Sequence, residues 1–249
     1  MSAFEISLSA TPFDSEALSE VISRYRSIDQ MQAVHDFEQA IKDFSGAKYA
    51  VALNSGTAGI HLALKAAGVG PGDQVMVSTF TYVATVNPIL YLGATPVFID
   101  SQASTWNMDP ILLEEALTQS RRSGANVRAI LVVHAYGMPA DMIAINEVAR
   151  KFNVPVIEDA AESLGSEMNN IKLGNLGICG VFSFNNNKLI TTYGGGAIIT
   201  NDESIHRKVL LWASQARENK PYYEHKEVGF NYRMGPLTAI QGLAMMPKV

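Results

Sequence analysis

Short runs of β-branched and apolar residues recur along the chain, and most are followed by a segment with helical periodicity. Arg128–His134 and Gly196–Thr200 are apolar on consecutive positions rather than on every second one. A strand with that pattern is buried on both faces, as in a parallel sheet covered by helices. The pattern therefore predicts an α/β protein with a mostly parallel sheet and helices on both faces.

The expected elements follow from this periodicity and from the turn signals between them. We expect strands at Tyr49–Asn54, Gln74–Ser78, Thr95–Asp100, Arg128–His134, Val154–Glu158, Gly180–Phe184 and Gly196–Thr200. We expect helices at Ala58–Ala67, Val83–Leu92, Pro110–Gln119, Asp141–Phe152 and Glu203–Arg217. In such a doubly wound sheet, ligands bind beyond the carboxyl ends of the strands.

The composition limits the class of protein. The 249 residues are 47% hydrophobic and carry a net charge of −5, which suits a buried core and argues against a nucleic-acid or anionic-membrane surface. The single cysteine, the absence of a signal-peptide pattern and the absence of a run of roughly 18 apolar residues predict a cytoplasmic protein. The histidines are not in zinc-ligand spacing, so no metal site is expected.

Lys188 lies between the apolar triplet FSF and the glycine-rich turn GGG. An amine at the end of a strand, beside small residues that let a flat ligand approach, suits a lysine that forms a Schiff base with pyridoxal 5′-phosphate (PLP). The alternative is an ordinary solvated lysine. A free lysine amine has a pKa near 10.4 and is a poor nucleophile at neutral pH, but burial beside a cofactor can lower that value.

The segment after Asn54 offers an anion site. Ser55, Gly56 and Thr57 open a helix directly after a strand, where free N–H groups and two hydroxyls suit a phosphate. The alternative is that Ser55 or Thr57 is a simple helix cap.

Asp159 ends a buried strand, where a carboxylate can keep a pyridine nitrogen protonated. Glu162 follows three residues later and is expected on the same helical face, near the ring's phenolic oxygen. Helix capping is the alternative for both acids. Tyr82 follows a strand and is a candidate for stacking on a planar ring, the alternative being a core aromatic.

These segments and others resemble the DegT/DnrJ/StrS family of nucleotide-sugar aminotransferases, which have the fold-type I, aspartate aminotransferase-like architecture. The matching stretches include NSGTAGIHLAL, STFTYVATVNPILYLGATPVFID, HAYGMPADM, VIEDAAESLGS, FSFNNNKLITTYGGGAIITND and GFNYRM. They run in the family's order from about Val34 onward. We therefore expect an N-terminal arm at residues 1–33 and a PLP-binding large domain at residues 34–249. Family members continue into a smaller C-terminal domain, and we expect this sequence to stop before it.

The resemblance implies the roles of the lysine and the acidic residues. Lys188 would carry the cofactor and move the proton during transamination. Members with dehydratase activity have histidine at this position, so the lysine favours transamination. Asp159 would pair with the pyridinium nitrogen. Glu162 stands where the family has Gln, His or Glu near the phenolic oxygen.

The resemblance also implies how the rest of the cofactor is held. Gly56, Thr57 and Ser183 would hold the phosphate, and Tyr82 would stack on the ring. Asn231 of GFNYRM would reach the phosphate of the neighbouring subunit, so the site would be shared in a homodimer.

The implied reaction moves an amino group, usually from glutamate, to a keto sugar on a nucleotide diphosphate. The segments NNNKLITTYGGG and SQARENKPYYEHKEVGFNYRM most resemble those of members that aminate carbon 4 of a UDP-linked 4-keto-6-deoxy-N-acetylhexosamine. The alternative is a truncated, catalytically incompetent PLP-binding remnant or regulatory module. A nucleotide-binding Rossmann protein is disfavoured, since NSGTAG replaces a G-x-G-x-x-G turn.

Overall fold

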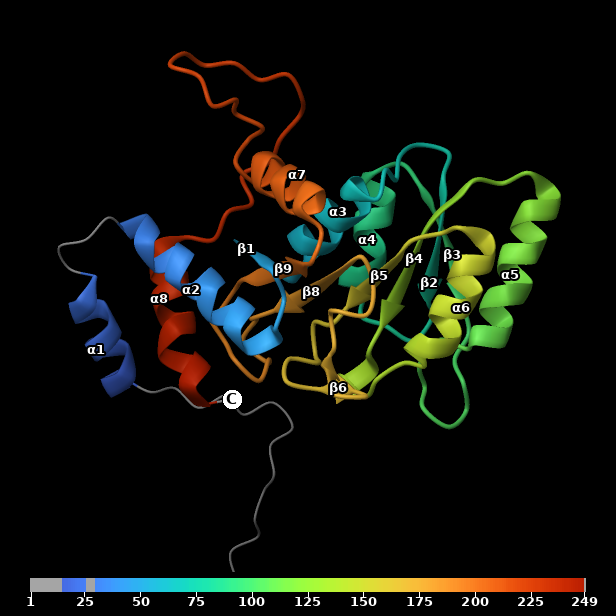
Figure 1. Ribbon diagram of the computed structural model, residues 1–249, viewed down its shortest axis with the longest axis horizontal. Coiled ribbons are helices and arrows are strands. Elements are labelled where there is room, and N and C mark those ends of the chain that lie inside the picture. Colours follow the sequence, from blue (N-terminus) through green and yellow to red (C-terminus); the bar gives the residue numbers. More distant parts are fainter. Residues whose placement is uncertain (1–14, 26–29, 249) are drawn as a thin grey trace, which may run out of the picture.

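The structure is a computed structural model that describes residues 15–25 and 30–248 (Figure 1). Its helices are α1 (Ser15–Arg24), α2 (Gln30–Ser45), α3 (Gly56–Ala66), α4 (Val83–Tyr91), α5 (Pro110–Ser123), α6 (Met142–Phe152), α7 (Glu203–Ala213) and α8 (Pro236–Met245), with 3-10 turns η1 (Ala135–Gly137) and η2 (Met246–Lys248). Its strands are β1 (Tyr49–Leu53), β2 (Gln74–Ser78), β3 (Thr95–Ile99), β4 (Val127–Val133), β5 (Val156–Asp159), β6 (Glu167–Met168), β7 (Ile171–Lys172), β8 (Cys179–Ser183) and β9 (Gly196–Thr200).

A seven-stranded sheet in the order β1-β9-β8-β5-β4-β2-β3 forms the centre of the fold. The neighbours from β8 to β3 run parallel, while β9 is antiparallel to both β8 and β1. Strands β6 and β7 form a separate small hairpin. The prediction of a mostly parallel α/β sheet is confirmed.

Helices cover both faces of the sheet. On one face α3, α4 and α7 pack over the strands, and on the other α2 and α8 cover one half while α5 and α6 cover the other (Figure 1). Within β2, Val75 and Val77 face the first layer and Met76 faces the second. The consecutive apolar positions therefore reflect burial on both sides of the pleat.

Most expected elements agree with the structure to within about two residues. Two helices are exceptions: α5 continues to Ser123 rather than ending at Gln119, and α7 ends at Ala213 rather than at Arg217. Gln215 has a φ of 58° and its N–H donates to the carbonyl oxygen of Phe230 at 3.0 Å, so the chain turns out of the helix to pair with a later segment. A helical period of apolar residues does not reveal such a long-range partner.

The N-terminal segment of the described chain packs against the C-terminal helix. Val21 of α1 and Val34 of α2 are buried in the same cluster as Ile240 of α8. The expected boundary at Val34 falls inside α2, and residues 1–14 and 26–29 lie outside the described part, so the division into arm and domain stays a prediction.

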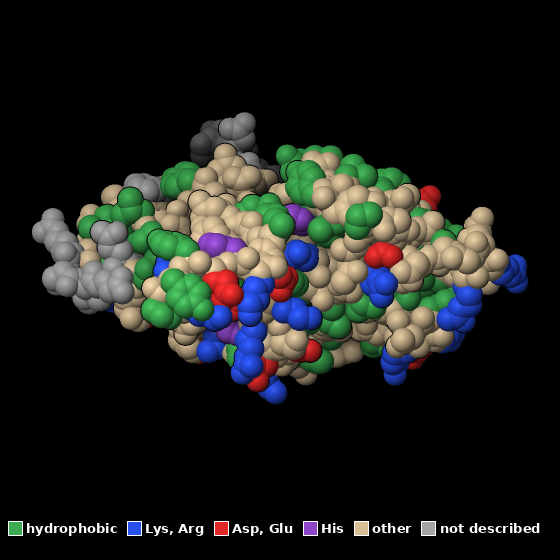
Figure 2. Space-filling view, turned by 90° about the horizontal axis from the view of Figure 1, so that it is seen from above, with side chains coloured by type: hydrophobic (Ala, Val, Ile, Leu, Met, Phe, Trp, Pro, Cys, Tyr) green, Lys and Arg blue, Asp and Glu red, His purple; other side chains and the backbone are tan. Residues whose placement is uncertain are grey.

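The connection between α7 and α8 projects from the body of the molecule (Figure 1). Arg207 pairs with Glu203 on α7, and Lys220 pairs with Glu224 on the connection. Figure 2, the view from above, shows basic and acidic side chains lying beside one another on this face. Among the described residues, no helix is long and apolar enough to span a lipid bilayer.

Candidate cofactor site

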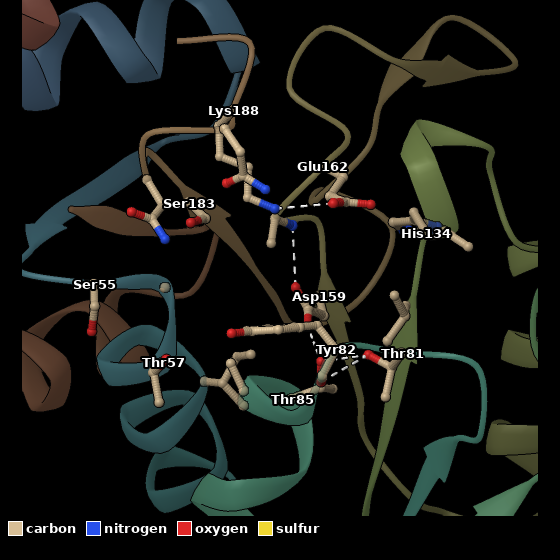
Figure 3. A pocket seen from close by; sticks show the side chains of 18 of the residues that line it. Ser55, Thr57, Thr81, Tyr82, Thr85, His134, Asp159, Glu162, Ser183 and Lys188 are labelled. Atoms are coloured by element: carbon tan, nitrogen blue, oxygen red, sulfur yellow. Dashed lines mark hydrogen bonds and ion pairs between the residues drawn. The ribbon is translucent and has the colours of Figure 1, made fainter. Parts of the chain in front are cut away.

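A pocket of about 670 Å³ lies at the carboxyl ends of β4, β5 and β8 (Figure 3). Parallel strands bring the residues that follow them to one edge of the sheet, where α/β proteins bind their ligands. Eight of the nine predicted site residues line this pocket: Ser55, Gly56, Thr57, Tyr82, Asp159, Glu162, Ser183 and Lys188.

The start of α3 forms one wall of the pocket. Ser55 is the N-cap, and its hydroxyl oxygen accepts a hydrogen bond from Ala58 N at 3.0 Å. The capping alternative is therefore correct for Ser55, and it does not exclude a pocket role. Gly56 and Thr57 present first-turn N–H groups, which have no acceptor within the helix and suit an anion.

Close backbone packing explains the glycines of this wall. A Cβ on Gly196 of β9 would lie 2.5 Å from the backbone nitrogen of Gly56, and a Cβ on Gly56 would lie 3.1 Å from Cβ of Ser183. Glycine at both positions lets β9, β8 and the start of α3 meet, which brings the Ser183 hydroxyl beside the first turn.

Asp159 forms part of the buried floor. Its Oδ2 accepts a hydrogen bond from the hydroxyl of Thr85 at 2.6 Å, and its Oδ1 accepts one from Ala161 N at 3.1 Å (Figure 3). Burial raises the pKa of Asp159, and these two hydrogen bonds and the charge of Lys188 act in the opposite direction. A cation that binds beside this carboxylate would stabilise its charged form.

Lys188 reaches the pocket from the loop after β8. Its Nζ lies 3.1 Å from Oε1 of Glu162, and its side chain is 16% exposed. The alternative of a solvated surface lysine is therefore not supported. The other carboxylate oxygen of Glu162 accepts a hydrogen bond from Tyr136 N at 3.1 Å, which fixes the acid beside the amine.

The expected helix after Asp159 is absent, which corrects the reason given for the position of Glu162. Ala160 N donates to the carbonyl oxygen of Val181 on β8, and residues 160–166 then form turns. The bond to the neighbouring strand competes with helix formation. Glu162 reaches the pocket through these turns rather than on a helical face.

Tyr82 and Asn231 differ in their placement. Tyr82 is 78% exposed, and Figure 3 shows its ring extending across the pocket between Asp159 and the start of α3, so the core alternative is wrong. Asn231 does not line the pocket: its carbonyl oxygen accepts from Asn54 and its side-chain oxygen from Gln215. Its expected contact is with a neighbouring subunit, so that role stays a prediction.

Sequence reasoning missed several residues around the site. Thr85 follows Thr81 by four residues, and their hydroxyl oxygens are 2.6 Å apart. This spacing of two threonines in the sequence could have pointed to Thr85. Phe80 and Tyr136 also line the pocket. No metal-binding group of three or more His, Cys, Asp or Glu side chains occurs among the described residues.

His134, also missed, lines the pocket and forms a buried pair with Glu158. Its Nε2 lies 2.9 Å from Oε2 of Glu158, and its Nδ1 accepts a hydrogen bond from Ala140 N. Glu158 also accepts hydrogen bonds from the backbone N–H groups of Gly174, Leu176 and Gly177. Every oxygen of this buried carboxylate is thus satisfied, and the pair holds the loop before β8 in place.

Comparison with known proteins identifies the family and the fold. Residues 11–249 match the model of the DegT/DnrJ/EryC1/StrS aminotransferase family, and the chain belongs to this family. It is 48% identical over 213 residues to a "Putative pyridoxal phosphate-dependent aminotransferase EpsN" of Bacillus subtilis, covering 86% of this chain and 55% of that protein.

Two further relatives are similar over a comparable share of the chain. A GDP-perosamine synthase of Caulobacter vibrioides is 45% identical over 86% of this chain and 56% of its own length. A UDP-2-acetamido-2-deoxy-3-oxo-D-glucuronate aminotransferase of Pseudomonas aeruginosa is 39% identical over 87% of this chain and 57% of its own length. The chain thus spans little more than half the length of these relatives.

Solved structures show the same fold. PseC of Helicobacter pylori, an aminotransferase of pseudaminic acid biosynthesis, superposes with a TM-score of 0.86 at 30% identity over 98% of this chain and 66% of its own. A putative sugar aminotransferase of Streptococcus pneumoniae in its PLP form gives a TM-score of 0.86 at 25% identity over 98% of this chain and 67% of its own. The fold-type I architecture is confirmed, and PLP is the cofactor of the family.

The residues present fit this cofactor. The pocket volume lies within the range of small-molecule sites. A buried carboxylate, a shielded amine and a helix N-terminus line it, and these match the ring nitrogen, the aldehyde and the phosphate of PLP.

Proposed function

We propose that this chain forms the PLP-holding part of an aminotransferase that transfers an amino group to a keto sugar linked to a nucleotide diphosphate. The observation that carries the proposal is the convergence of the Lys188 amine, the Asp159 carboxylate and the start of α3 on one pocket. The family membership and the names of the relatives support it.

The bound cofactor would supply an electron sink for the carbon next to the amino nitrogen. Asp159 would hold the proton on the ring nitrogen, because an ionised carboxylate beside it favours the protonated ring. Thr85 would hold Asp159 in position through the 2.6 Å hydrogen bond to Oδ2. The sheet positions Asp159 itself, since the residue is the last of β5.

Lys188 would be both the covalent attachment point and the base. A lysine amine attacks a carbonyl only after it loses a proton. Oε1 of Glu162, 3.1 Å from Nζ, keeps the amine pointing into the pocket. Lys188 would later move a proton between the two carbon atoms that exchange it during transamination. Its amine can do so because it lies inside the same pocket as the reacting groups.

The remaining residues would bind and orient the cofactor. The N–H groups of Gly56 and Thr57 and the hydroxyl of Ser183 would bind the phosphate at the positive end of α3. Tyr82 would cover the ring and exclude water from one face. Ser55 supports this wall by capping the helix.

We further propose glutamate as the donor and carbon 4 of a UDP-linked 4-keto-6-deoxy-N-acetylhexosamine as the acceptor. The sequence around Lys188 supports this substrate, while the names of the relatives include both GDP- and UDP-linked sugars. Mass spectrometry of the products from UDP- and GDP-linked 4-keto sugars separates the two nucleotides: a GDP-amino sugar as the sole product would contradict the finer proposal.

A homodimer in the cytoplasm completes the proposal. Asn231 lies outside the pocket of its own chain, in the segment that follows the projecting connection and pairs with Ser214, which suits a contact with a second copy. Cys179 is buried and unpaired, as suits a reducing compartment.

An absorbance titration tests the function. Added PLP should produce a visible band with the native protein and with Lys151→Gln, an exposed-lysine control, but not with Lys188→Gln. Glutamate should then remove the band. A band that glutamate leaves unchanged would favour the PLP-binding remnant or regulatory module, and no band would overturn the proposal.

A further inference from the structure

Three aromatic side chains form an exposed cluster beside the cofactor pocket. Phe80 follows β2, Trp106 follows β3 and Tyr136 follows β4, and these three strands are neighbours in the sheet. Their ring centroids lie 5.4 Å apart for Phe80–Trp106 and 6.1 Å apart for Phe80–Tyr136. We call these three residues the aromatic rim.

The rim is not part of the hydrophobic core. Trp106 is 62% exposed and Tyr136 is 81% exposed. Both also have a left-handed backbone, with φ of 61° and 50°. A bulky residue rarely adopts this conformation, and such strain is concentrated at functional sites because the surrounding structure must enforce it.

Asn107 enforces this arrangement. Its side chain is almost fully buried; its Nδ2 donates to the carbonyl oxygen of Met138 at 3.0 Å, and its Oδ1 accepts from Ala135 N at 2.9 Å. One amide thus clamps the loop that carries Trp106 to both ends of the turn that carries Tyr136. The rings are therefore held in place before any ligand arrives, which lowers the entropic cost of binding.

The rim continues the cofactor pocket outward. Phe80 and Tyr136 line the pocket, whereas Trp106 lies just beyond its lining. Tyr136 N contacts the same Glu162 carboxylate that contacts Lys188. A ligand whose reacting end is at the amine would therefore place its far end against these rings.

We propose that the aromatic rim is a stacking platform for the base of the nucleotide-sugar substrate. This inference rests on the proposed function for the identity of the ligand. In a nucleotide sugar the keto sugar, the diphosphate and the base follow one another in that order, so a sugar at Lys188 directs the base outward. Stacking on an aromatic face is tolerant of base identity. The platform would therefore accept UDP and GDP alike, and other contacts would discriminate between them.

Tryptophan fluorescence of the cofactor-free protein provides a direct test. The chain has two tryptophans, and Trp212 is buried with its Nε1 donating to Glu227, so the Trp212→Phe variant reports on Trp106 alone. UDP and GDP should each quench this emission saturably, while inorganic diphosphate and glucose 1-phosphate should not. Quenching by diphosphate alone, or none with UDP, would overturn the proposal.

Calorimetry of UDP binding gives a second measurement that does not depend on the Trp212 variant. Trp106→Ala should weaken UDP binding about tenfold, in line with the loss of one stacked ring. Trp106→Phe should retain most of the affinity, and Tyr223→Ala, which removes an exposed ring on the projecting connection, should not change it. Equal affinities for all four proteins would contradict the proposal.

The two proposals can fail separately. Nucleotide binding is measured without PLP, so a failed PLP titration leaves the rim result unaffected, and the reverse also holds. If Trp106 emission instead changes with protein concentration, in step with the sedimenting mass and without response to UDP, then a second copy of the chain covers the rim and the proposal is wrong.

Discussion

Thr85 donates its hydroxyl hydrogen to the carboxylate that the proposed chemistry needs in its charged form. Without this hydrogen bond, burial would favour the protonated acid more strongly. Lys188 is a basic group whose charge also favours ionised Asp159. The role of Thr85 is thus one of positioning and charge stabilisation, since its hydroxyl contacts Asp159 and Thr81.

Thr85→Val should destabilise the cofactor-free protein in a pH-dependent way. The pKa of Asp159 is raised in the folded state, so the protein loses stability as pH rises above the ordinary aspartate value, and the variant should lose more. Near neutral pH we expect a deficit of about 1.5–3 kcal/mol, and the deficit should shrink in acid. Urea unfolding at several pH values measures it.

Thr85→Ser is the matched control because it keeps the hydroxyl. It should restore the pH dependence of the native protein. If Thr85→Val shows the same deficit at every pH, Thr85 contributes by packing alone.

At the scale of elements, His61 of α3 ties the helix layer to the segment that follows the projecting connection. Its ring packs edge-on against Phe230 and Tyr91, and its Nδ1 lies 3.2 Å from the hydroxyl of Tyr232. Burial lowers the pKa of His61, and the charge of Lys65 lowers it further. The neutral form is therefore the one that packs.

Acidification should weaken this contact. Because the pKa of His61 is lowered in the folded state, its contribution to stability is present above the ordinary histidine pKa and is lost as pH falls below it. In His61→Asn, the decrease in unfolding free energy between about pH 7.5 and 5.5 should be smaller than in the native protein. It should not vanish, because the pKa of His206 is also lowered by burial. An unchanged decrease would contradict this assignment.

The junction of β9 with α3 tolerates no side chain at Gly196. A Cβ there would lie 2.5 Å from Gly56 N and 2.7 Å from the carbonyl oxygen of Phe182, and backbone atoms in a sheet cannot move aside. Gly196→Ala should cost about 1–3 kcal/mol and weaken PLP binding. Gly70→Ala is the control, because no atom lies within 4 Å of its Cβ position. Urea unfolding of both variants measures the loss of stability, and an equal loss in the two would contradict this explanation.

Sequence patterns predicted the elements better than their ends and their junctions. Buried strands such as β2 can be recognised from a few consecutive apolar residues. The end of α7, in contrast, depends on the pairing of Gln215 with the distant Phe230. The site residues at strand ends were found because each follows a predicted strand. Thr85 and Asn107 were missed because their roles depend on partners 74 and 28 or more residues away in the chain.

At the scale of the whole molecule, we expect the projecting connection to contribute to the contact between two copies of the chain. Tyr222, Tyr223 and Val228 are exposed on it, which suits coverage by a second copy. If Asn231 completes the site of a neighbouring subunit, the site is shared between two chains. We expect sedimentation to give twice 27.0 kDa.

Mixing two defective variants tests the shared site. Lys188→Ala and Asn231→Ala should each bind PLP poorly, but heterodimers formed by mixing them contain one site with both native residues. Tight PLP binding should return in about a quarter of the sites. No recovery after proven subunit exchange would show that Asn231 does not act across subunits.

We expect the Lys188 nitrogen to be the atom that joins PLP to this chain. Borohydride reduction of the PLP-loaded protein, followed by peptide mass spectrometry, locates the modified residue. We predict a single pyridoxyl modification on the peptide that contains Lys188, and its loss in Asp159→Asn or in the absence of PLP. Modification of other lysines with Lys188 unlabelled would contradict the account.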